Sequence, residues 1–193
     1  MHTPLPSRVK STADAVTVLR RLVQDHGNLM LHQSGGCCDG SAPMCFPDGE
    51  FVVGDTDVLL GVLDLRLVIG QVPERQPTGP DAVPVWISEP QFEVWKHTQL
   101  ILDIVPGRGA GFSLESPAGV RFLSRARAFT AEEMFRLGPV GTLRGIDWRN
   151  GQVPVLPSEP QVLSVAGDSC PVAEDLSRFN SINKYSQLSR ETP

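Results

Sequence analysis

The segment Leu29-Met30-Leu31-His32-Gln33-Ser34-Gly35-Gly36-Cys37-Cys38-Asp39-Gly40-Ser41, which continues through Pro43 to Cys45, is the stretch around which the chain is organised. Its first five residues are mostly apolar and lie between glycines, so they predict a strand. The strand leads into a loop that combines glycines, adjacent cysteines and an acid. Glycine allows backbone conformations that other residues avoid, and thiolates bind soft metals and iron–sulfur clusters. We therefore expect a strand that ends in a reactive loop.

A helix is predicted immediately before this strand, from Ser11 to His26. Ser11 is the expected N-cap with Asp14 three residues later, and Gly27 is the expected C-terminal stop. Apolar residues recur at helical spacing on one face, namely Val16, Leu19, Leu22 and Val23. The pattern is typical of an amphipathic helix that packs on a sheet.

The rest of the chain predicts short strands and few helices. Seventeen prolines and 18 glycines favour strands, turns and loops over a helical bundle. Strands are expected at 58–63, 67–69, 85–87, 99–105, 112–114 and 120–123. Short helices are expected from Ser88 to His97 and from Thr130, which has Glu133 at the capping-box position. The fold class is therefore α+β: a compact, β-rich domain with an N-terminal amphipathic helix.

The expected organisation is one domain with two appendages. Residues 1–10 are expected to form a flexible N-terminus, and residues 11–137 the α+β domain. From Gly138 the composition changes to Gly-Pro pairs, further prolines and a polar end. We expect residues 138–193 to be a loosely packed, proline-rich extension.

Charge and hydropathy exclude some classes of protein. The 193 residues carry a net charge of −5 and a pI near 5.3, which argues against a broad nucleic-acid-binding surface. The apolar stretch from Val58 to Ile69 contains Asp64 and Arg66 and is too short to span a bilayer. No secretory signal is visible, so a cytoplasmic location with reduced thiols is expected. In that setting, cysteines bind metal or do redox work.

The candidate site is a metal or iron–sulfur centre held by Cys37, Cys38 and Cys45, with His32 or His97 as further ligands. Iron, an iron–sulfur cluster and zinc are the candidate cofactors. A complete CxxC…CxxC pattern is absent, so a closed structural zinc site has little support. Three cysteines leave the site one ligand short, and His32, Asp39, a solvent molecule or a second subunit would complete it. A shared centre would make the protein a homo-oligomer.

Several alternatives remain open from the residues alone. Cys37 and Cys38 are alternatively small packing residues, or Cys38 and Cys45 form a redox-sensitive bridge. In a thiol enzyme, one low-pKa cysteine would attack an aldehyde or a disulfide and another would resolve it. The chain would otherwise be a metal-free interaction module. No G-x-S-x-G or HExxH motif is present, and separated residues do not define a Ser-His-Asp triad.

Several motifs resemble the bacterial family numbered 779 among the domains of unknown function. They are the segments 26–30, 32–41, 43–45, 48–51, 57–61, 91–100, 105–109 and 111–115. The resemblance covers about residues 10 to 130. Members of this family are often encoded beside aldehyde dehydrogenases, so the resemblance implies an accessory role with an aldehyde or alcohol dehydrogenase as partner.

A more distant resemblance concerns the HesB-like A-type iron–sulfur carriers. It rests on the helix, the strand and the Gly-Gly-Cys loop, with Asp103 and Gly111-Phe112-Ser113 further along. It implies a sandwich or pseudo-barrel that binds iron or a cluster between subunits, with Cys37 or Cys38 as the first ligand. The carriers' C-terminal Cys-x-Cys pair would fall at 124–127, where this chain has Ser-Arg-Ala-Arg. Two of the three usual ligands are therefore absent.

Overall fold

The computed structural model describes residues 4–35, 42–107 and 111–165, and all structural statements concern these residues. They form nine strands, four α-helices and two 3₁₀ turns: β1 (Val9–Thr12), α1 (Ala13–His26), β2 (Leu29–Gln33), β3 (Met44–Pro47), β4 (Val58–Asp64), η1 (Gly79–Asp81), β5 (Ala82–Ile87), α2 (Glu89–Trp95), β6 (Thr98–Pro106), η2 (Ser116–Ala118), β7 (Val120–Ala128), α3 (Ala131–Val140), β8 (Leu143–Arg144), α4 (Gly145–Arg149) and β9 (Val162–Leu163). The expected class, a β-rich α+β domain with an N-terminal amphipathic helix, is confirmed.

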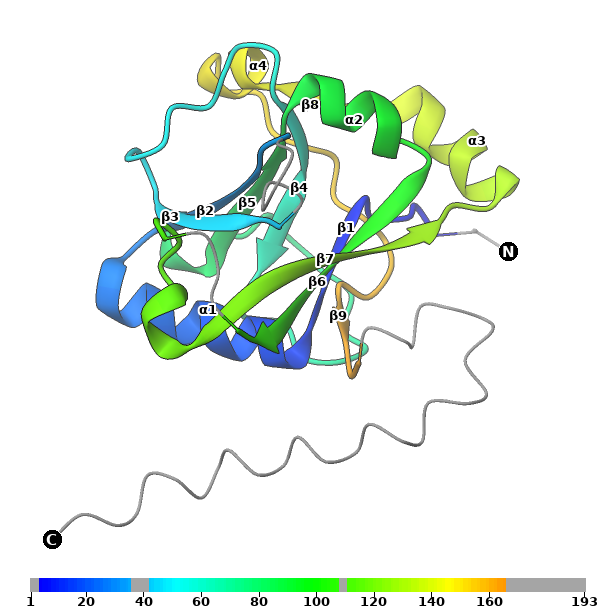
Figure 1. Cartoon of the computed structure of the whole chain (residues 1–193). Helices are drawn as coiled ribbons and strands as arrows, with labels where there is room; N and C mark the ends of the chain where they lie inside the picture. Colours follow the sequence, from blue (N-terminus) through cyan, green and yellow to red (C-terminus); the bar gives the residue numbers. More distant parts are fainter. Residues whose placement is uncertain (1–3, 36–41, 108–110, 166–193) are drawn as a thin grey trace, which may run out of the picture.

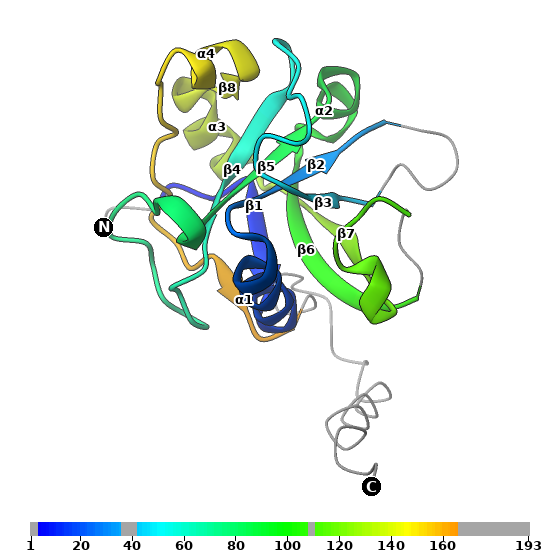
Figure 2. The same ribbon diagram turned by 90° about the vertical axis from the view of Figure 1, so that its left-hand side faces the viewer.

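The strands form two sheets that do not close into a barrel within the described residues. One sheet has the order β3-β2-β5-β4-β8 and the other the order β7-β6-β1-β9. In the first, β2 and β5 are parallel and the other neighbours are antiparallel. In the second, β1 is parallel to both β6 and β9. Helix α1 lies at one end of the molecule, and α2, α3 and α4 gather at the opposite end (Figures 1 and 2). None of the described helices is long and apolar enough to cross a membrane.

Helix α1 forms as its sequence predicts, with a cap one residue later than expected. The N-cap is Thr12, whose hydroxyl accepts the backbone N–H of Ala15 at 3.2 Å. Ser11 instead lies in β1 and pairs with Val162 of β9. Gly27 ends the helix with φ 77°, a conformation that favours glycine. The helix buries its apolar face in the main core.

The five-stranded sheet is apolar on both faces, so the side chains of β2 enter a different core on each face. Leu29 and Leu31 belong to the main core, which lies between the two sheets and α1. Because successive strand residues point to opposite faces, Met30 and His32 lie on the outer face. There Met30 packs with Leu59, Val62 and Trp86 in a second cluster. The outer face therefore carries its own small core beside His32.

Two predicted strands are absent. Residues 67–69 lie in the loop after β4, where the guanidinium of Arg20 donates to the carbonyls of Leu65 and Leu67 at 2.7 and 3.0 Å. Residues 112–114 do not pair with β7, because β6 extends through Pro106 and takes β7 as its antiparallel partner. The segment instead borders β3, where the Leu114 N–H donates to the Cys45 carbonyl at 3.1 Å.

The expected boundaries of the domain differ from the structure at both ends. Strand β1 lies inside the four-stranded sheet, so residues 9–10 belong to the domain rather than to a flexible N-terminus. Residues 138–165 are not a loosely packed extension, since β8 pairs with β4 and β9 pairs with β1. In addition, Trp148 contacts Trp86 edge-on, with ring centroids 5.9 Å apart. The predicted extension beyond residue 165 lies outside the described residues.

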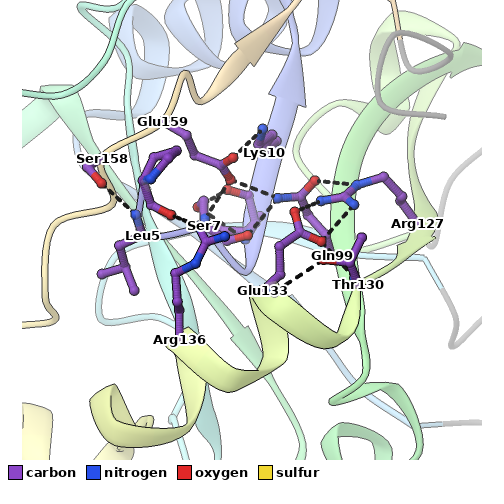
Figure 3. A network of polar contacts seen from close by, with 12 residues as sticks. Leu5, Ser7, Lys10, Gln99, Arg127, Thr130, Glu133, Arg136, Ser158 and Glu159 are labelled. Atoms are coloured by element: carbon purple, nitrogen blue, oxygen red, sulfur yellow. Dashed lines mark hydrogen bonds and ion pairs between the residues drawn. The ribbon is translucent and has the colours of Figure 1, made fainter. Parts of the chain in front are cut away.

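A polar network ties these end segments to the sheet (Figure 3). The Glu159 carboxylate accepts the Ser7 N–H at 2.7 Å and the Gln99 side-chain amide at 3.1 Å. Lys10 Nζ lies 3.3 Å from the same carboxylate. Segments near residues 7 and 159 are therefore fixed to β1 and β6 by a shared, largely buried carboxylate.

Candidate functional site

The side chain of His32 lies at the end of β2, on the outer face of the five-stranded sheet. It is almost fully buried, with 3% of its surface exposed. Its Nε2 lies 3.0 Å from Asp57 Oδ2, and its Nδ1 lies 2.8 Å from Ser34 Oγ. The ring of Phe51 covers the imidazole, with centroids 4.5 Å apart. Both ring nitrogens are thus hydrogen-bonded, one to an acid and one to a hydroxyl.

Asp57 is held firmly by the turn that precedes β4. Its Oδ2 accepts the backbone N–H of Gly54 at 2.7 Å, and its own N–H donates to the Gly54 carbonyl at 3.2 Å. Its carbonyl accepts the N–H of Gly145 at 2.9 Å. A Cβ on Gly145 would collide with the Gly54 carbonyl oxygen, so this close approach requires glycine. The first residue of α4 therefore supports the turn that carries Asp57.

The neighbours of His32 determine which of its ring nitrogens carries the proton. The Asp57 carboxylate accepts the Nε2–H, so the neutral ring keeps its lone pair on Nδ1 and accepts the Ser34 hydroxyl there. Burial lowers the pKa of His32, and the hydrogen bond and charge of Asp57 only partly oppose that shift. At neutral pH we therefore expect an uncharged imidazole in a single tautomer.

This arrangement gives Nδ1 two chemical uses. A ring nitrogen that keeps its lone pair while the other nitrogen donates to a carboxylate is suited to binding a metal ion. The same lone pair is suited to accepting a proton from a nucleophile. Ser34 and Gly35 lead directly into residues 36–41 of the loop. Cys37, Cys38 and Asp39 lie outside the described residues, as does Cys170.

Cys45 lies on the other side of the sheet from His32. It pairs with Leu31 across β2 and β3, and its free thiol is fully buried in the main core. Burial, and secondarily the charge of Glu115, raise the pKa of the Cys45 thiol far above its ordinary value. Cys45 and His32 therefore do not share a site, and this thiol has the environment of an inert structural cysteine.

The backbone at Cys45 is fixed by a buried polar group. The Cys45 N–H donates to Ser113 Oγ at 2.8 Å, and the Ser113 hydroxyl donates to the Glu115 carboxylate. Burial raises the pKa of Glu115, although the hydrogen bond from Ser113 opposes that shift. The segment 111–115 thus stabilises the edge strand β3 through these hydrogen bonds.

His97 lies in the turn between α2 and β6, where its side chain is exposed. Its carbonyl accepts the N–H of Phe129 at 2.9 Å. The turn leads into the four-stranded sheet, whereas His32 belongs to the five-stranded one. Within the described ranges, no group of three histidine, cysteine or acidic side chains is arranged to hold a metal. Of the candidate ligands that the structure describes, His32 alone lies on the outer face of the five-stranded sheet.

Sequence reasoning missed Asp57 and Ser34. Ser34 was detectable, because residues two apart in a strand share a face. Asp57 lies 25 residues from His32, and no local pattern indicates which acid approaches the imidazole. Two of the three arginines of β7 form ion pairs within the fold, since Arg125 pairs with Asp103 and Arg127 pairs with Glu133, each at 2.7 Å.

Comparison with known proteins gives one result. No curated protein and no solved structure matches the chain. Residues 18–128, more than half of its length, match a family described as a domain of unknown function, DUF779. The matched region contains His32, Ser34 and Asp57. By this match, the chain belongs to the DUF779 family.

Proposed function

We propose that the chain is a metal-binding accessory protein of an aldehyde or alcohol dehydrogenase system. Nδ1 of His32 is one ligand, and the thiols of Cys37 and Cys38 in the adjoining loop are the others. The observation that carries this proposal is the 3.0 Å contact between His32 Nε2 and Asp57. Metal-binding histidines almost always donate their second ring N–H to such a partner.

The residues present favour a single ion over a cluster. Cys45 faces the core and His97 is exposed at the other sheet, so neither supports the predicted ligand set. Two loop thiols and one imidazole are typical ligands for zinc or iron with one open position. An iron–sulfur cluster takes four ligands, mostly thiolates. The HesB-like interpretation would therefore need ligands from a second subunit, and hence a homo-oligomer.

Each described residue has a defined task in this proposal. Asp57 fixes the tautomer and direction of the imidazole, and the Gly54–Asp57 turn fixes Asp57. Phe51 covers the ring and keeps water from its face. When bound, the ion would supply a Lewis acid that polarises a carbonyl or alcohol oxygen.

The partner and the location are part of the same proposal. The family resemblance supports an aldehyde or alcohol dehydrogenase as partner. A cytoplasmic site of action is proposed with it, because reducing conditions there keep thiols free to bind metal. The net charge of −5 argues against nucleic acid as a partner.

Metal analysis of anaerobically purified protein tests the proposal. We expect about one zinc or iron ion per chain, a large loss of metal in His32→Gln and Cys37→Ser/Cys38→Ser, and a roughly 10–100-fold weaker affinity in Asp57→Asn. Cys45→Ala and His97→Gln are matched controls that should retain the metal. Wild-type protein that stays metal-free after reconstitution with Fe²⁺ or Zn²⁺ would refute the proposal.

A thiol enzyme is the second candidate, and the Ser34–His32 hydrogen bond favours it. That bond directs a hydroxyl proton towards the lone pair of Nδ1, as a general base requires. In this reading His32 takes the proton of a loop thiol, and the thiolate adds to an aldehyde carbon to form a hemithioacetal. The imidazolium then returns the proton to the new alkoxide oxygen. Saturable aldehyde addition by metal-free protein, lost in His32→Gln but retained in His97→Gln, would favour this candidate.

A further inference from the structure

The outer face of the five-stranded sheet carries a cavity of about 600 Å³ beside the His32 site. Its floor is built from alternate residues of three strands: Met30 of β2, Val62 of β4, and Ala82, Pro84 and Trp86 of β5. Its walls are the segments 48–53, 76–79 and 148–154. The volume lies within the range of small-molecule sites.

Aromatic side chains contribute to the lining of the cavity. The indoles of Trp86 and Trp148 meet edge to face with centroids 5.9 Å apart, and both line it. Phe51 lines the cavity as well. Such rings offer large apolar area and prefer edge-to-face or offset contacts with another ring. The lining therefore favours a ligand with a flat apolar body.

The charged groups around the cavity argue against an anionic ligand. The Arg149 guanidinium donates to the Val53 carbonyl at 3.0 Å and pairs with Asp55, so its charge is already compensated within the protein. The Gln76 side-chain amide donates to the Pro154 carbonyl. Asp48 is exposed at the rim and adds a negative charge. Among the described residues that line the cavity, a carboxylate would meet the charge of Asp48 and no unpaired cation, whereas an uncharged molecule would meet no repulsion.

Phe51 connects the cavity to His32. Its ring contacts the imidazole at a tilt, with centroids 4.5 Å apart, and stacks on Phe46 with centroids 4.8 Å apart. His32 also lies opposite Trp86 in the register of β2 and β5. A molecule in the cavity would therefore be separated from the imidazole by a single ring.

We propose that this cavity is a binding site for an uncharged small molecule with a flat aromatic body. The site requires no metal at His32, and it goes beyond the proposed function because Phe51 is the one side chain named above that it shares with the His32 site. Ligand binding in the cavity and metal binding at His32 are measured separately, so either proposal can fail without the other.

Nuclear magnetic resonance of the full chain treated with a metal chelator tests this site. The indole N–H signals of Trp86, Trp148 and Trp95 are followed during titration with benzyl alcohol and, separately, with benzoate. We expect saturable shifts of the Trp86 and Trp148 signals with benzyl alcohol, little change at Trp95 of α2, and at least tenfold weaker binding of benzoate. The His32 ring signals should move together with those of the cavity.

Variants show whether the ligand occupies this cavity. Ala82→Phe fills the floor and should abolish the shifts, whereas Ala128→Phe on the exposed end of β7 should leave them unchanged. Thr78→Trp narrows the cavity from the exposed wall without changing the sheet, and it replaces Ala82→Phe if that variant does not fold. The proposal is overturned if no saturable shift occurs, if benzoate binds as well as benzyl alcohol, or if narrowing the cavity has no effect.

Discussion

The Nε2 atom of His32 lies 3.0 Å from Oδ2 of Asp57, and this contact leaves Nδ1 as the lone-pair nitrogen that faces Ser34. The acid comes from the turn before β4, and the histidine from the end of β2. Because α4 supports that turn through Gly145, three separate segments fix the ring of one histidine. Burial of this extent around a polar group is costly unless each polar atom is satisfied, and here both ring nitrogens are.

Replacing Asp57 with Asn should release the tautomer of His32. The amide both donates and accepts, so it no longer requires a proton on Nε2. We expect ¹⁵N spectra of the ring to change from one tautomer to a mixture, and the free energy of unfolding to fall by about 1–3 kcal/mol. Asp55→Asn is the control, because Asp55 is exposed and its pair with Arg149 should contribute little. A single unchanged tautomer in Asp57→Asn would show that the carboxylate does not direct the ring.

Cys45 should behave as a structural residue. Its raised pKa and burial predict that iodoacetamide at pH 8 does not label it in the native protein and labels it after unfolding, as peptide mass spectrometry would show. Cys45→Ser places a hydroxyl in the core and should cost about 1–3 kcal/mol. Metal content should stay that of the wild type. Rapid native labelling would contradict the assignment and return Cys45 to the candidate ligands.

Local patterns in the sequence predicted local structure, but they did not predict which strands pair when they lie far apart along the chain. Helix α1, β2 and the capping box of Thr130 and Glu133 were all predicted, because each depends on residues within a few positions. The face of Cys45 depends on its register with Leu31, and the role of Asp57 on how β4 joins the sheet. Strands β1 and β9 are short and parallel, so their pairing has no nearby turn to reveal it.

Glu133 should make stability depend on pH in the acid range. The hydrogen bond from Arg127 is the main cause that lowers the pKa of Glu133 from 4.5 to about 2. A lowered carboxyl pKa stabilises the fold above the ordinary value, and the contribution is lost as pH falls from about 4.5 towards 2. We expect Glu133→Gln to lower the free energy of unfolding by about 1–2 kcal/mol at pH 7, and by less at pH 3.

Glu132→Gln is the matched control for this experiment. Glu132 is the preceding residue and pairs with Arg136 on the surface of α3, where its side chain is largely exposed. Exposed pairs contribute little, so its urea-denaturation midpoint should stay close to wild type at both pH values. A constant difference between Glu133→Gln and wild type across this range would contradict the assigned pKa.

Gly145→Ala should disturb the His32 site from a distance. The added Cβ would collide with the Gly54 carbonyl and touch Val53, so the turn that holds Asp57 must move. We expect a loss of about 1–3 kcal/mol, as for overpacking, together with shifted ring signals of His32. Gly138→Ala is the control, because nothing lies within 4 Å of its Cβ position and alanine favours the helix. It should be neutral or stabilise by up to about 1 kcal/mol. Unchanged His32 signals in Gly145→Ala would show that α4 does not support the site.

Glu159 should be essential to the fold, although it lies in the segment whose sequence predicts a loose extension. Lys10 is 8% exposed, and its ammonium lies 3.3 Å from the Glu159 carboxylate (Figure 3). Glu159→Ala leaves that charge without its partner and also removes the acceptor of the Ser7 N–H, so we expect a loss of about 3–5 kcal/mol in urea denaturation. Lys10→Met in the Glu159→Ala background should recover part of that loss, because it removes the uncompensated charge. Glu93→Ala, which breaks an exposed pair with Lys96 on α2, should cost less than about 1 kcal/mol. A buried ammonium that loses its counter-charge lowers the stability of the fold. A Glu159→Ala protein as stable as the Glu93→Ala protein would therefore mean that the residues near 159 do not contribute to the stability of the domain.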